Sequence, residues 1–428
     1  MPTPLDRPAE PLPEVVADDA KLAEAAARLA AGTGPVAVDA ERASGHRYGN
    51  DAYLVQLRRE GTGTVLLDPT GIDDMSPLSA ALDGPEWVLH AATQDLPCLT
   101  DLGLAPRALF DTELGGRLVG LPRVGLAAVV EHYLGLTLAK EHSAVDWSTR
   151  PLPHDWLVYA ALDVEVLVET RDAMEQDLER LGRLEWARQE FEALTHFRGK
   201  EHTEEAWRRT SGSHRLRRPR QAATLRELWQ VRDAMARERD VPPSKVIRDE
   251  ALVALATAPM VEPADMAPVV KFALAGRSGR ARGGRPSRTA GTTERRVRRA
   301  LATLQGHQEQ WWGAVQRARA LPEDQLPAAR LPAVGAPPAK AWADKDPRAA
   351  ARLARARADL GEIADDLGVP VENLLTPSLL RDLLWETAER DRVDADEVER
   401  HLADGGAREW QRGLAVPVVV RAVAEAAA

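Results

Sequence analysis

Two acidic residues stand at the end of an apolar stretch, where the sequence reads GPVAVDAERA over residues 34–43. If residues 35–41 form a strand, Asp39 and Glu41 are two positions apart and point to the same face. Adjacent carboxylates repel each other, and a bound divalent cation relieves that repulsion. Because all the donor atoms are oxygens, Mg²⁺ or Mn²⁺ fits better than Zn²⁺. The alternative is that the two acids merely end a strand at the protein surface.

Three further side chains could complete such a site. Asp95 follows the strand-like EWVLHA (86–91) and falls in the first turn of the next helix, where a carboxylate also complements the helix dipole. Tyr159 and Asp163 are four residues apart in WLVYAALDVEVL (156–167), so they share one face if this segment is helical. Each placement is common in proteins that have no site there. The prediction of a site therefore depends on all five residues coming together.

The surrounding patterns predict the elements that would position these residues. Residues 14–31 have the periodicity of an amphipathic helix, and helical periodicity dominates again from about residue 93 to 195. Short apolar runs between turn residues predict strands at 35–41, 52–59, 63–69, 86–91 and 108–112. The first three strands are joined by short turns, which favours antiparallel hairpins. We therefore expect an α/β domain in which helices cover a mixed sheet, followed from about residue 219 by all-α domains.

The order of these residues resembles the DEDD superfamily of 3′-5′ exonucleases, in the subclass with tyrosine in its third motif, and within it the ribonuclease D family. The resemblance is carried by VDAE, AYLVQL and LLDP within residues 35–69 and by DWSTRPLPHDWLVYAALDVEVL at 146–167. It implies an RNase H-like fold and hydrolysis of a phosphodiester bond with two metal ions, Mg²⁺ or Mn²⁺. It also implies that 5′-mononucleotides are released from the 3′ end of a nucleic acid strand.

The resemblance also implies a role for each residue of the site. Asp39 would bridge the two ions, and Glu41 and Asp163 would complete the ligands of the ion on the nucleophile side. Asp95 would hold the other ion. Tyr159 would hydrogen-bond the attacking water and orient it.

A second group of residues is expected to contact the substrate: Arg42, Gln56, His90, Lys140, Trp147 and Arg150. Arg42 stands where ribonuclease D often has a bulky aromatic residue against the terminal base, so its guanidinium would stack on a base or hold a phosphate. Structural roles are the alternative. Gln56 would then lie on the sheet surface, His90 would end a strand, and Arg150 would bind backbone carbonyls in a buried corner.

The second half of the chain resembles helical nucleic-acid-binding modules. The stretch RDVPPSKVIRDEAL (239–252) is similar to the HRDC domain of helicases and ribonuclease D, and residues 346–384 repeat its outline of helix, proline turn and helix. We expect an exonuclease domain at 1–200, an HRDC domain at 215–282, a basic flexible linker at 283–300 and a second helical HRDC-like domain at 301–428. The basic residues expected to contact nucleic acid are Arg208, Arg209, Arg215, Arg217, Arg218, Arg220 and Lys245. An ordinary helical bundle without such contacts is the alternative.

Charge is distributed unevenly along the chain, whose net charge is −10. Residues 1–200 contain 18 Lys/Arg and 33 Asp/Glu, whereas residues 206–300 contain 22 and 9, a net charge of +13. A basic segment beside an acidic one indicates a polyanionic partner, although a solvated Arg-rich surface would have the same composition.

The remaining composition predicts a cytoplasmic protein without a membrane segment, expected to be a monomer. Cys98 is the single cysteine, which fits a reducing compartment, and no signal peptide or long apolar run is present. The function expected is that of a 3′→5′ exoribonuclease that trims the 3′ ends of tRNA precursors and other structured RNAs. A 3′→5′ exonuclease acting on single-stranded DNA and a non-catalytic RNA-binding scaffold are the alternatives. The scaffold is disfavoured because all four acids and the tyrosine are present.

Overall fold

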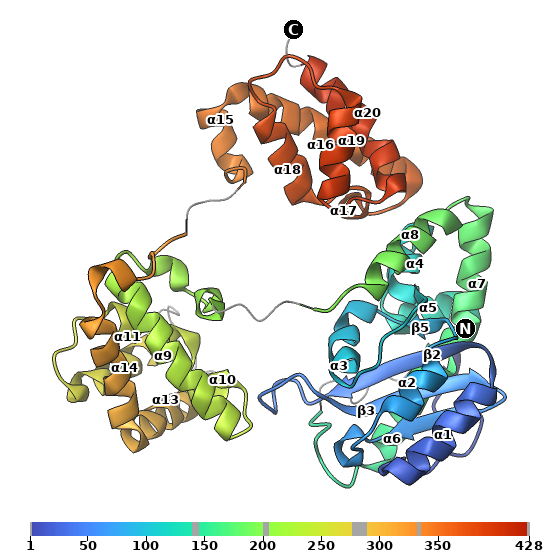
Figure 1. Ribbon diagram of the computed structural model, residues 1–428, viewed down its shortest axis with the longest axis horizontal. Coiled ribbons are helices and arrows are strands. Elements are labelled where there is room, and N and C mark those ends of the chain that lie inside the picture. Colours follow the sequence, from blue (N-terminus) through green and yellow to red (C-terminus); the bar gives the residue numbers. More distant parts are fainter. Residues whose placement is uncertain (1, 139–144, 200–204, 276–288, 332–334, 426–428) are drawn as a thin grey trace. The chain divides into compact units, whose positions relative to one another are not determined.

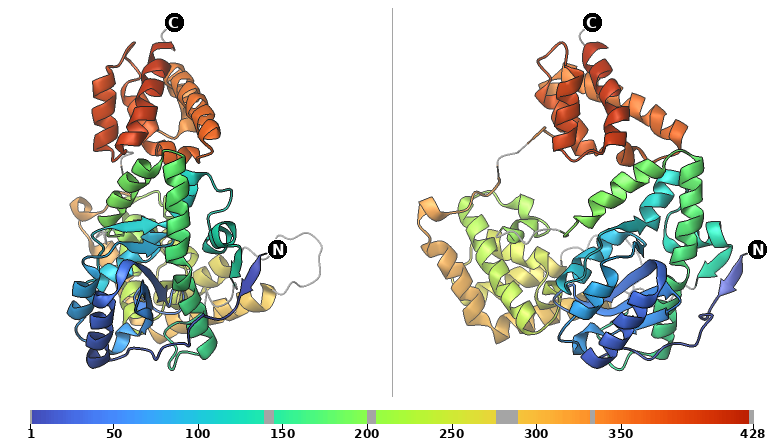
Figure 2. Two further views of the ribbon diagram at one scale, coloured as in Figure 1. Left: turned by 90° about the vertical axis from the view of Figure 1, so that its right-hand side faces the viewer. Right: turned by 45° about the vertical axis from the view of Figure 1, so that its right-hand side comes forward.

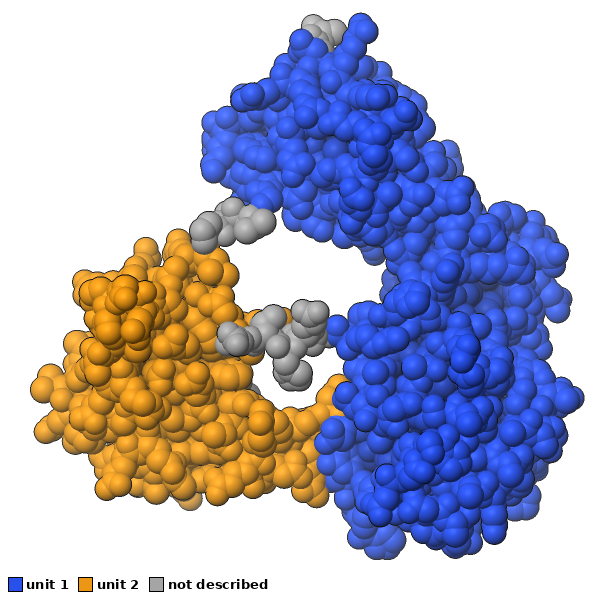
Figure 3. Space-filling view, viewed as in Figure 1, with its two compact units in different colours: residues 1–42, 51–199, 333–428 blue, residues 43–50, 200–332 orange. Residues whose placement is uncertain are grey.

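The computed structural model describes residues 2–138, 145–199, 205–275, 289–331 and 335–425. The chain forms two compact units (Figures 1 and 3). Unit 1 comprises residues 1–42, 51–199 and 333–428, and unit 2 comprises residues 43–50 and 200–332. Each unit has its own hydrophobic core.

A five-stranded mixed sheet forms the centre of unit 1, in the order β4-β3-β2-β5-β6. Strands β2 and β3, and β3 and β4, are antiparallel, whereas β5 and β6 continue the sheet parallel to β2. The strands are β2 (Thr33–Arg42), β3 (Ala52–Glu60), β4 (Gly63–Leu67), β5 (Trp87–Leu89) and β6 (Leu109–Asp111). A separate pair joins β1 (Thr3–Leu5) to β7 (Leu136–Leu138). The predicted α/β class and all five predicted strands of the sheet are confirmed.

Helices cover both faces of this sheet. Val36, Val38 and Ala40 of β2 belong to the same buried cluster as Leu22 and Leu29 of α1. The helices of this domain are α1 (Asp19–Ala31), α2 (Ser76–Leu82), α3 (Leu96–Asp101), α4 (Thr112–Val119), α5 (Leu126–Leu134), α6 (His154–Glu165), α7 (Leu167–Arg180) and α8 (Leu184–Thr195). Because side chains alternate along a strand, the residues between those three apolar positions point to the opposite face.

Helix α1 begins five residues later than the periodicity predicted. Asp18 is its N-cap, and the Asp18 carboxylate accepts a hydrogen bond from the backbone N–H of Lys21 at 2.8 Å. Capping of this kind satisfies a backbone donor that the first helical turn leaves free. Pro11 and Pro13 precede the cap and do not extend the helix. Single 3₁₀ turns lie elsewhere, at Pro69–Gly71, Ala92–Gln94, Ala206–Arg209, Ser213–Arg215, Pro263–Asp265, Glu323–Gln325 and Ala339–Ala341.

Unit 1 also contains a helical domain from the C-terminal part of the chain. Its helices are α15 (Trp342–Lys345), α16 (Pro347–Leu367), α17 (Val371–Leu374), α18 (Pro377–Glu386), α19 (Ala395–Asp404) and α20 (Glu409–Glu425). Trp342, Leu353 and Leu380 lie in its own buried cluster. The predicted outline of helix, proline turn and helix is present, because Pro370 separates α16 from the one-turn α17.

This helical domain packs against α8 (Figure 2). The rings of Trp186 and Trp410 stack with centroids 4.8 Å apart, and Trp410 Nε1 donates a hydrogen bond to Glu190 at 3.1 Å. Arg183 donates to the carbonyl of Leu367 at 2.7 Å. A stacked tryptophan pair and bonded polar groups indicate a specific contact rather than a loose tether.

Replacing Trp410 by Ala should loosen this contact. The side chain is 6% exposed, so its removal should lower the free energy of unfolding by about 3 kcal/mol. Hydrogen exchange of the α8 backbone amides is the measurement, and these amides should lose protection. Trp385→Ala is the matched control, because Trp385 packs on Trp342 inside the helical domain, with ring centroids 5.0 Å apart. Equal effects of both variants on α8 would contradict the prediction.

Among its described residues, unit 2 contains helices and connecting turns but no strand. Its helices are α9 (Pro219–Glu238), α10 (Pro243–Val246), α11 (Asp249–Thr257), α12 (Met266–Ala275), α13 (Thr289–Gly306) and α14 (Gln308–Ala320). Within the unit, the Tyr48 hydroxyl bonds the Asp233 carboxylate at 2.9 Å, and Arg47 pairs with Asp240 at 2.9 Å. The loop 43–50, expected to belong to the exonuclease domain, is therefore grouped with the helices.

Residues 289–300 are helical, where the composition predicted a flexible linker over 283–300. They form most of α13, while residues 283–288 lie outside the described residues. Ala300, Leu304 and Trp311 are buried in the same cluster as Leu225 of α9. The arginines of α13 concealed this apolar face from composition alone. The first helical domain consequently continues through α14, past the boundary expected at residue 301.

Candidate active site

Asp39 and Glu41 meet a third acid, Asp163, on one face of the sheet. One carboxylate oxygen from each of the three lies within 4.8 Å of the others, and all three residues are half-buried. Strand alternation accounts for the first two, because their neighbours Val38 and Ala40 are buried on the opposite face. The predicted convergence of the strand end with the late helix is thus present.

Helix α6 supplies Asp163 together with Tyr159. The two residues are one turn apart, and the Tyr159 hydroxyl hydrogen-bonds the Asp163 carboxylate. The helix is fixed to the sheet by Ala160 and Ala161, which pack with Leu54 and Leu66. Small residues at this contact allow the helix to approach the strands closely, so both functional groups reach the strand that carries Asp39.

Asp95 lies at the start of α3 and is 4% exposed. Its carboxylate is 3.2 Å from one guanidinium nitrogen of Arg42. The other terminal nitrogen of Arg42 donates a hydrogen bond to the Gln94 carbonyl at 2.5 Å. Burial and then repulsion from Asp39 raise the pKa of Asp95. We call Asp39, Glu41, Asp95 and Asp163 the acidic cluster.

Asp111 positions the turn that leads to Asp95, and sequence reasoning missed it. Its carboxylate accepts hydrogen bonds from the backbone N–H groups of Ala91 at 3.1 Å and Ala92 at 2.9 Å. Ala91 has φ of 58°, a left-handed conformation that a non-glycine residue adopts only when its surroundings hold it. Asp111 also caps α4 through Glu113. The available signal was the acidic residue at the end of the fifth strand, directly before a helix.

Burial raises the pKa of every member of the acidic cluster, and repulsion from neighbouring carboxylates raises it further for Glu41, Asp95 and Asp163. The pKa of Glu41 rises to about 10, first through burial and then through repulsion from Asp39, Asp163 and Asp95. The positive charge of Arg42 opposes this increase in pKa for three of the four members, Asp39, Glu41 and Asp95. Without a cation, Glu41 therefore favours its protonated form at neutral pH.

The cluster fits a hard divalent cation. Its donors are all carboxylate oxygens, and three of them converge closely enough to hold one ion. Asp39, Glu41 and Asp163 would provide that site, and Asp95 would face it from α3. A bound ion would remove the repulsion that raises the pKa values of Glu41, Asp95 and Asp163.

Metal binding should therefore stabilise the protein more at pH 8 than at pH 5. The folded, metal-free cluster binds protons that the unfolded chain releases near pH 4, so its contribution to stability falls as pH rises above that value. Mn²⁺ at about 100 times its dissociation constant should raise the melting temperature by about 5 °C or more at pH 8. The increase should be smaller at pH 5, where protons compete. Thermal unfolding with Mn²⁺ and with EDTA at both pH values measures this, and equal shifts would contradict the prediction.

Comparison with known proteins identifies the domains. The family model of the 3′-5′ exonuclease matches residues 13–179, and the HRDC model matches residues 221–272. Residues 335–423 match a different model, that of the 3′ to 5′ exonuclease C-terminal domain, where a second HRDC-like domain was expected.

Individual relatives agree with these models. Ribonuclease D of Escherichia coli is 37% identical over 227 residues, which are 52% of this chain and 60% of that protein. Ribonuclease D of Sphingobium indicum is 32% identical over 252 residues, 57% of this chain and 64% of that protein. The chain thus spans about three fifths of these relatives. The crystal structure of Escherichia coli RNase D covers 96% of this chain and 98% of its own, with a TM-score of 0.69 and 25% identity.

Over these segments the chain is similar to ribonuclease D. The crystal structure of a protein from Bifidobacterium adolescentis is also similar, with a TM-score of 0.83, 38% identity, and coverage of 99% of this chain and 100% of that one.

Two residues expected to contact the substrate, Gln56 and His90, are buried and half-buried, respectively. Gln56 faces the same side of the sheet as its register partner Asp39, but it is fully buried. His90 is half-buried and bonds the Thr112 hydroxyl at 2.9 Å; burial lowers its pKa to about 4. These contacts fit the structural alternative for His90, and its substrate contact stays a prediction. Lys140 lies outside the described residues.

Arg150 and Trp147 lie at a corner of the chain before α6, where Trp147 is buried and Arg150 is exposed. Arg150 holds Asp68 with two nitrogens at 2.5 and 2.7 Å and donates to the carbonyls of Trp147 and Tyr53 at 2.8 Å. These bonds occupy its guanidinium and lower the pKa of Asp68 despite its burial. Trp147 is fully buried against Trp156, with ring centroids 5.4 Å apart. The corner fixes the chain before α6 in this ribonuclease D relative.

Two of the predicted phosphate-contacting arginines hold unit 2 together. Arg208 lies over the Trp207 ring at 4.2 Å and donates to the Ala328 carbonyl at 2.8 Å. Arg220 bonds the last carbonyls of α14 and pairs with Glu323 at 2.5 Å. Lys245 is half-buried, with its Nζ 3.5 Å from the His46 carbonyl. The remaining four predicted contacts are exposed: Arg209, Arg215, Arg217 and Arg218.

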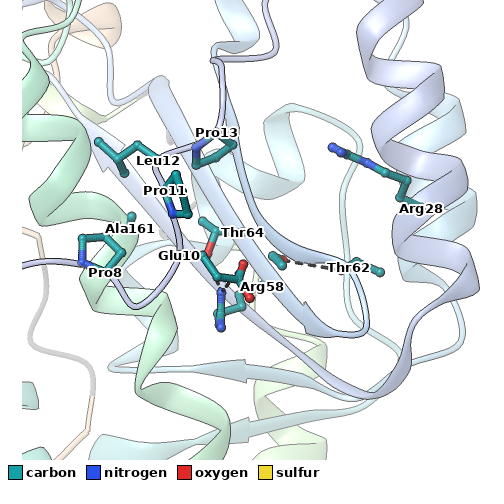
Figure 4. A pocket seen from close by; sticks show the side chains of 11 residues that line it. Pro8, Glu10, Pro11, Leu12, Pro13, Arg28, Arg58, Thr62, Thr64 and Ala161 are labelled. Carbon is teal, nitrogen blue, oxygen red and sulfur yellow. Dashed lines mark hydrogen bonds and ion pairs between the residues drawn. The ribbon is translucent and has the colours of Figure 1, made fainter.

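A separate cavity of about 190 Å³ lies at the proline-rich N-terminal segment of unit 1 (Figure 4). Pro8, Pro11 and Pro13 line one side, and Arg58 lies 3.7 Å from the Glu10 carboxylate. None of the acidic cluster lines this cavity. The catalytic assignment therefore depends on the acids of the sheet face and not on this hollow.

Proposed function

We propose that the protein is a metal-dependent 3′→5′ exoribonuclease that releases 5′-mononucleotides. The observation that supports this most directly is the convergence of Asp39, Glu41 and Asp163 within 4.8 Å on the exonuclease domain. We further propose tRNA precursors and other structured RNAs as substrates. The structure of Escherichia coli RNase D is described as that of an exoribonuclease involved in structured RNA processing.

The acidic cluster would hold two ions, Mg²⁺ or Mn²⁺, with Asp39 shared between them. When bound, such ions stabilise the charge that develops on the scissile phosphate and lower the pKa of water. Tyr159, whose hydroxyl already bonds Asp163, would position the attacking water through the same hydroxyl. Burial and the neighbouring carboxylates raise the pKa of Tyr159, so it stays protonated and can donate.

Gln56 is proposed as a positioning residue beside Asp39. Neither atom of its buried amide has a hydrogen-bond partner among the described residues. A buried amide without a partner costs free energy, so a water or a phosphate oxygen next to Asp39 would satisfy it. This role is a narrower form of the substrate contact that its place on the strand suggested.

The test compares RNA and DNA of one sequence, each labelled at the 5′ end. Incubation with Mg²⁺, with Mn²⁺ and with EDTA should give a ladder of products shortened from the 3′ end of RNA only when metal is present. Shortening of DNA in preference to RNA would support the DNA exonuclease instead. Intact substrates in every condition would leave the RNA-binding scaffold.

The cellular setting is a further part of the proposal. Within the described residues, the helices are too short or too polar to cross a membrane. We propose that the enzyme acts in the cytoplasm as a monomer. Light scattering after gel filtration measures the mass, for which the chain itself predicts 46.7 kDa.

A further inference from the structure

Unit 2 contains a cavity of about 500 Å³ between the α10–α11 turn and α13. One side is lined by Ser244 to Arg248, and the other by α13. Among these lining residues, Val246 and Ile247 on the first side and Ala300 on the second belong to the buried core of unit 2. Both walls are therefore anchored in the core of the unit, and the cavity is not formed by a loose tail.

The cavity has a strongly basic lining. Lys245 and Arg248 come from the α10–α11 side, and Arg295, Arg296 and Arg299 come from α13. The three α13 arginines are exposed, and no acid is among the residues that line the cavity. Five cations around one hollow repel each other unless an anion occupies it.

The acids nearest in sequence are engaged by neighbouring cations. Glu294 pairs with Arg298 at 3.2 Å on the helix itself, and Asp249 pairs with Arg232 at 2.5 Å. Glu250 is 3.3 Å from Arg248, which leaves part of that guanidinium paired. The net charge of the cavity thus stays positive.

We propose that this cavity binds consecutive phosphates of the RNA strand that the exonuclease domain shortens. The proposal rests on the proposed function for its choice of polyanion. Arginine suits this ligand, because its planar fork donates two parallel hydrogen bonds to one phosphate. The volume is that of a small-ligand site, large enough for a nucleotide unit. Most of its cations come from α13, which lies outside the segment matched as HRDC.

The test uses the double variant Arg296→Gln with Arg299→Gln in the full chain. Binding of a labelled single-stranded RNA of about 20 nucleotides is measured by fluorescence anisotropy in EDTA, across a series of salt concentrations. Loss of two phosphate contacts should weaken binding about tenfold at low salt. It should also reduce the slope of log affinity against log salt by about 1.4.

The matched control is Arg298→Gln with Arg317→Gln, which removes the same charge from the same unit. Both residues lie outside the cavity lining and are paired, Arg317 with Glu227 at 2.9 Å. The control should change the slope by less than half as much. Equal slopes for the two double variants, absence of RNA binding by the unmodified chain, or a cavity-dependent affinity for an acidic peptide that exceeds that for RNA would overturn the proposal.

Hydrolysis of a dinucleotide separates this proposal from the proposed function. A substrate this short should be cleaved equally by the unmodified chain and the cavity variant. If the unmodified chain binds RNA with the expected slope but cleaves nothing, the proposed function fails and the phosphate site stands. If cleavage proceeds and the slope does not change, only the phosphate site fails.

Discussion

Replacing Asp39 by Asn should abolish exonuclease activity without unfolding the protein. Asp39 is the member of the acidic cluster proposed to serve both metal ions, and metal stabilisation of a phosphoryl transition state is worth several kcal/mol. A loss of at least about 10³-fold in kcat is expected. Burial of the carboxylate, which raises the pKa of Asp39, costs free energy that a neutral amide does not. The metal-free variant should therefore melt at the same temperature or about 2–4 °C higher.

Initial rates on labelled RNA, together with melting curves in EDTA, measure both effects. Asp101→Asn is the matched control, because Asp101 is an exposed aspartate at the end of α3 in the same domain. It should retain full activity. An Asp39→Asn protein that degrades RNA at the unmodified rate would sink the assignment of the acidic cluster. A variant that is inactive because it is unfolded would show itself by a lowered melting temperature.

Replacing Tyr159 by Phe should lower kcat about 10²-fold and leave KM nearly unchanged. The hydroxyl bonds Asp163 and is proposed to position the attacking water, a role that contributes to the reaction but not to binding of the RNA chain. The ring itself packs beside Trp147, with centroids 6.5 Å apart, and phenylalanine retains this contact. Metal-induced stabilisation should persist in the variant, because the carboxylates remain.

Tyr133→Phe is the matched control for Tyr159. It removes a partly buried hydroxyl that bonds a carboxylate, that of Asp177 at 3.3 Å, in the same domain. Single-turnover rates should be normal for this control. A comparable loss in both variants, or an increase in KM without a change in kcat for Tyr159→Phe, would show that the hydroxyl serves the fold or the binding of substrate instead.

The two residues illustrate how the fold serves the chemistry. Asp39 lies in the middle strand of the sheet, hydrogen-bonded to β3 along its length, so packing on both faces restricts its backbone. Tyr159 and Asp163 come from a helix whose alanines contact the strands. A rigid strand and a closely packed helix hold ligands more accurately than loops do. Repulsion within the acidic cluster is the energetic consequence, and a cation would offset it.

Local sequence patterns were sufficient to predict the strands and the face of each element on which the site residues lie. The alternation in VDAE put Asp39 and Glu41 on one face, and the spacing of four put Tyr159 beside Asp163, because strand and helix geometry fix these directions. The five strands followed from apolar runs between turn residues. The order of the four acids and the tyrosine along the chain was enough to indicate the ribonuclease D family, although no single motif was specific.

Tertiary packing decided which polar residues are free to act. Arg42 pairs with Asp95, and Arg150 clamps Asp68, through partners 53 and 82 positions away along the chain. Composition described residues 283–300 as a linker, yet Ala300 and Leu304 bury one face of a helix against α9. The stacking of Trp186 on Trp410 likewise joins distant segments. Sequence spacing determines which side of its own element a residue occupies, whereas only the folded chain determines which charge or ring it meets there.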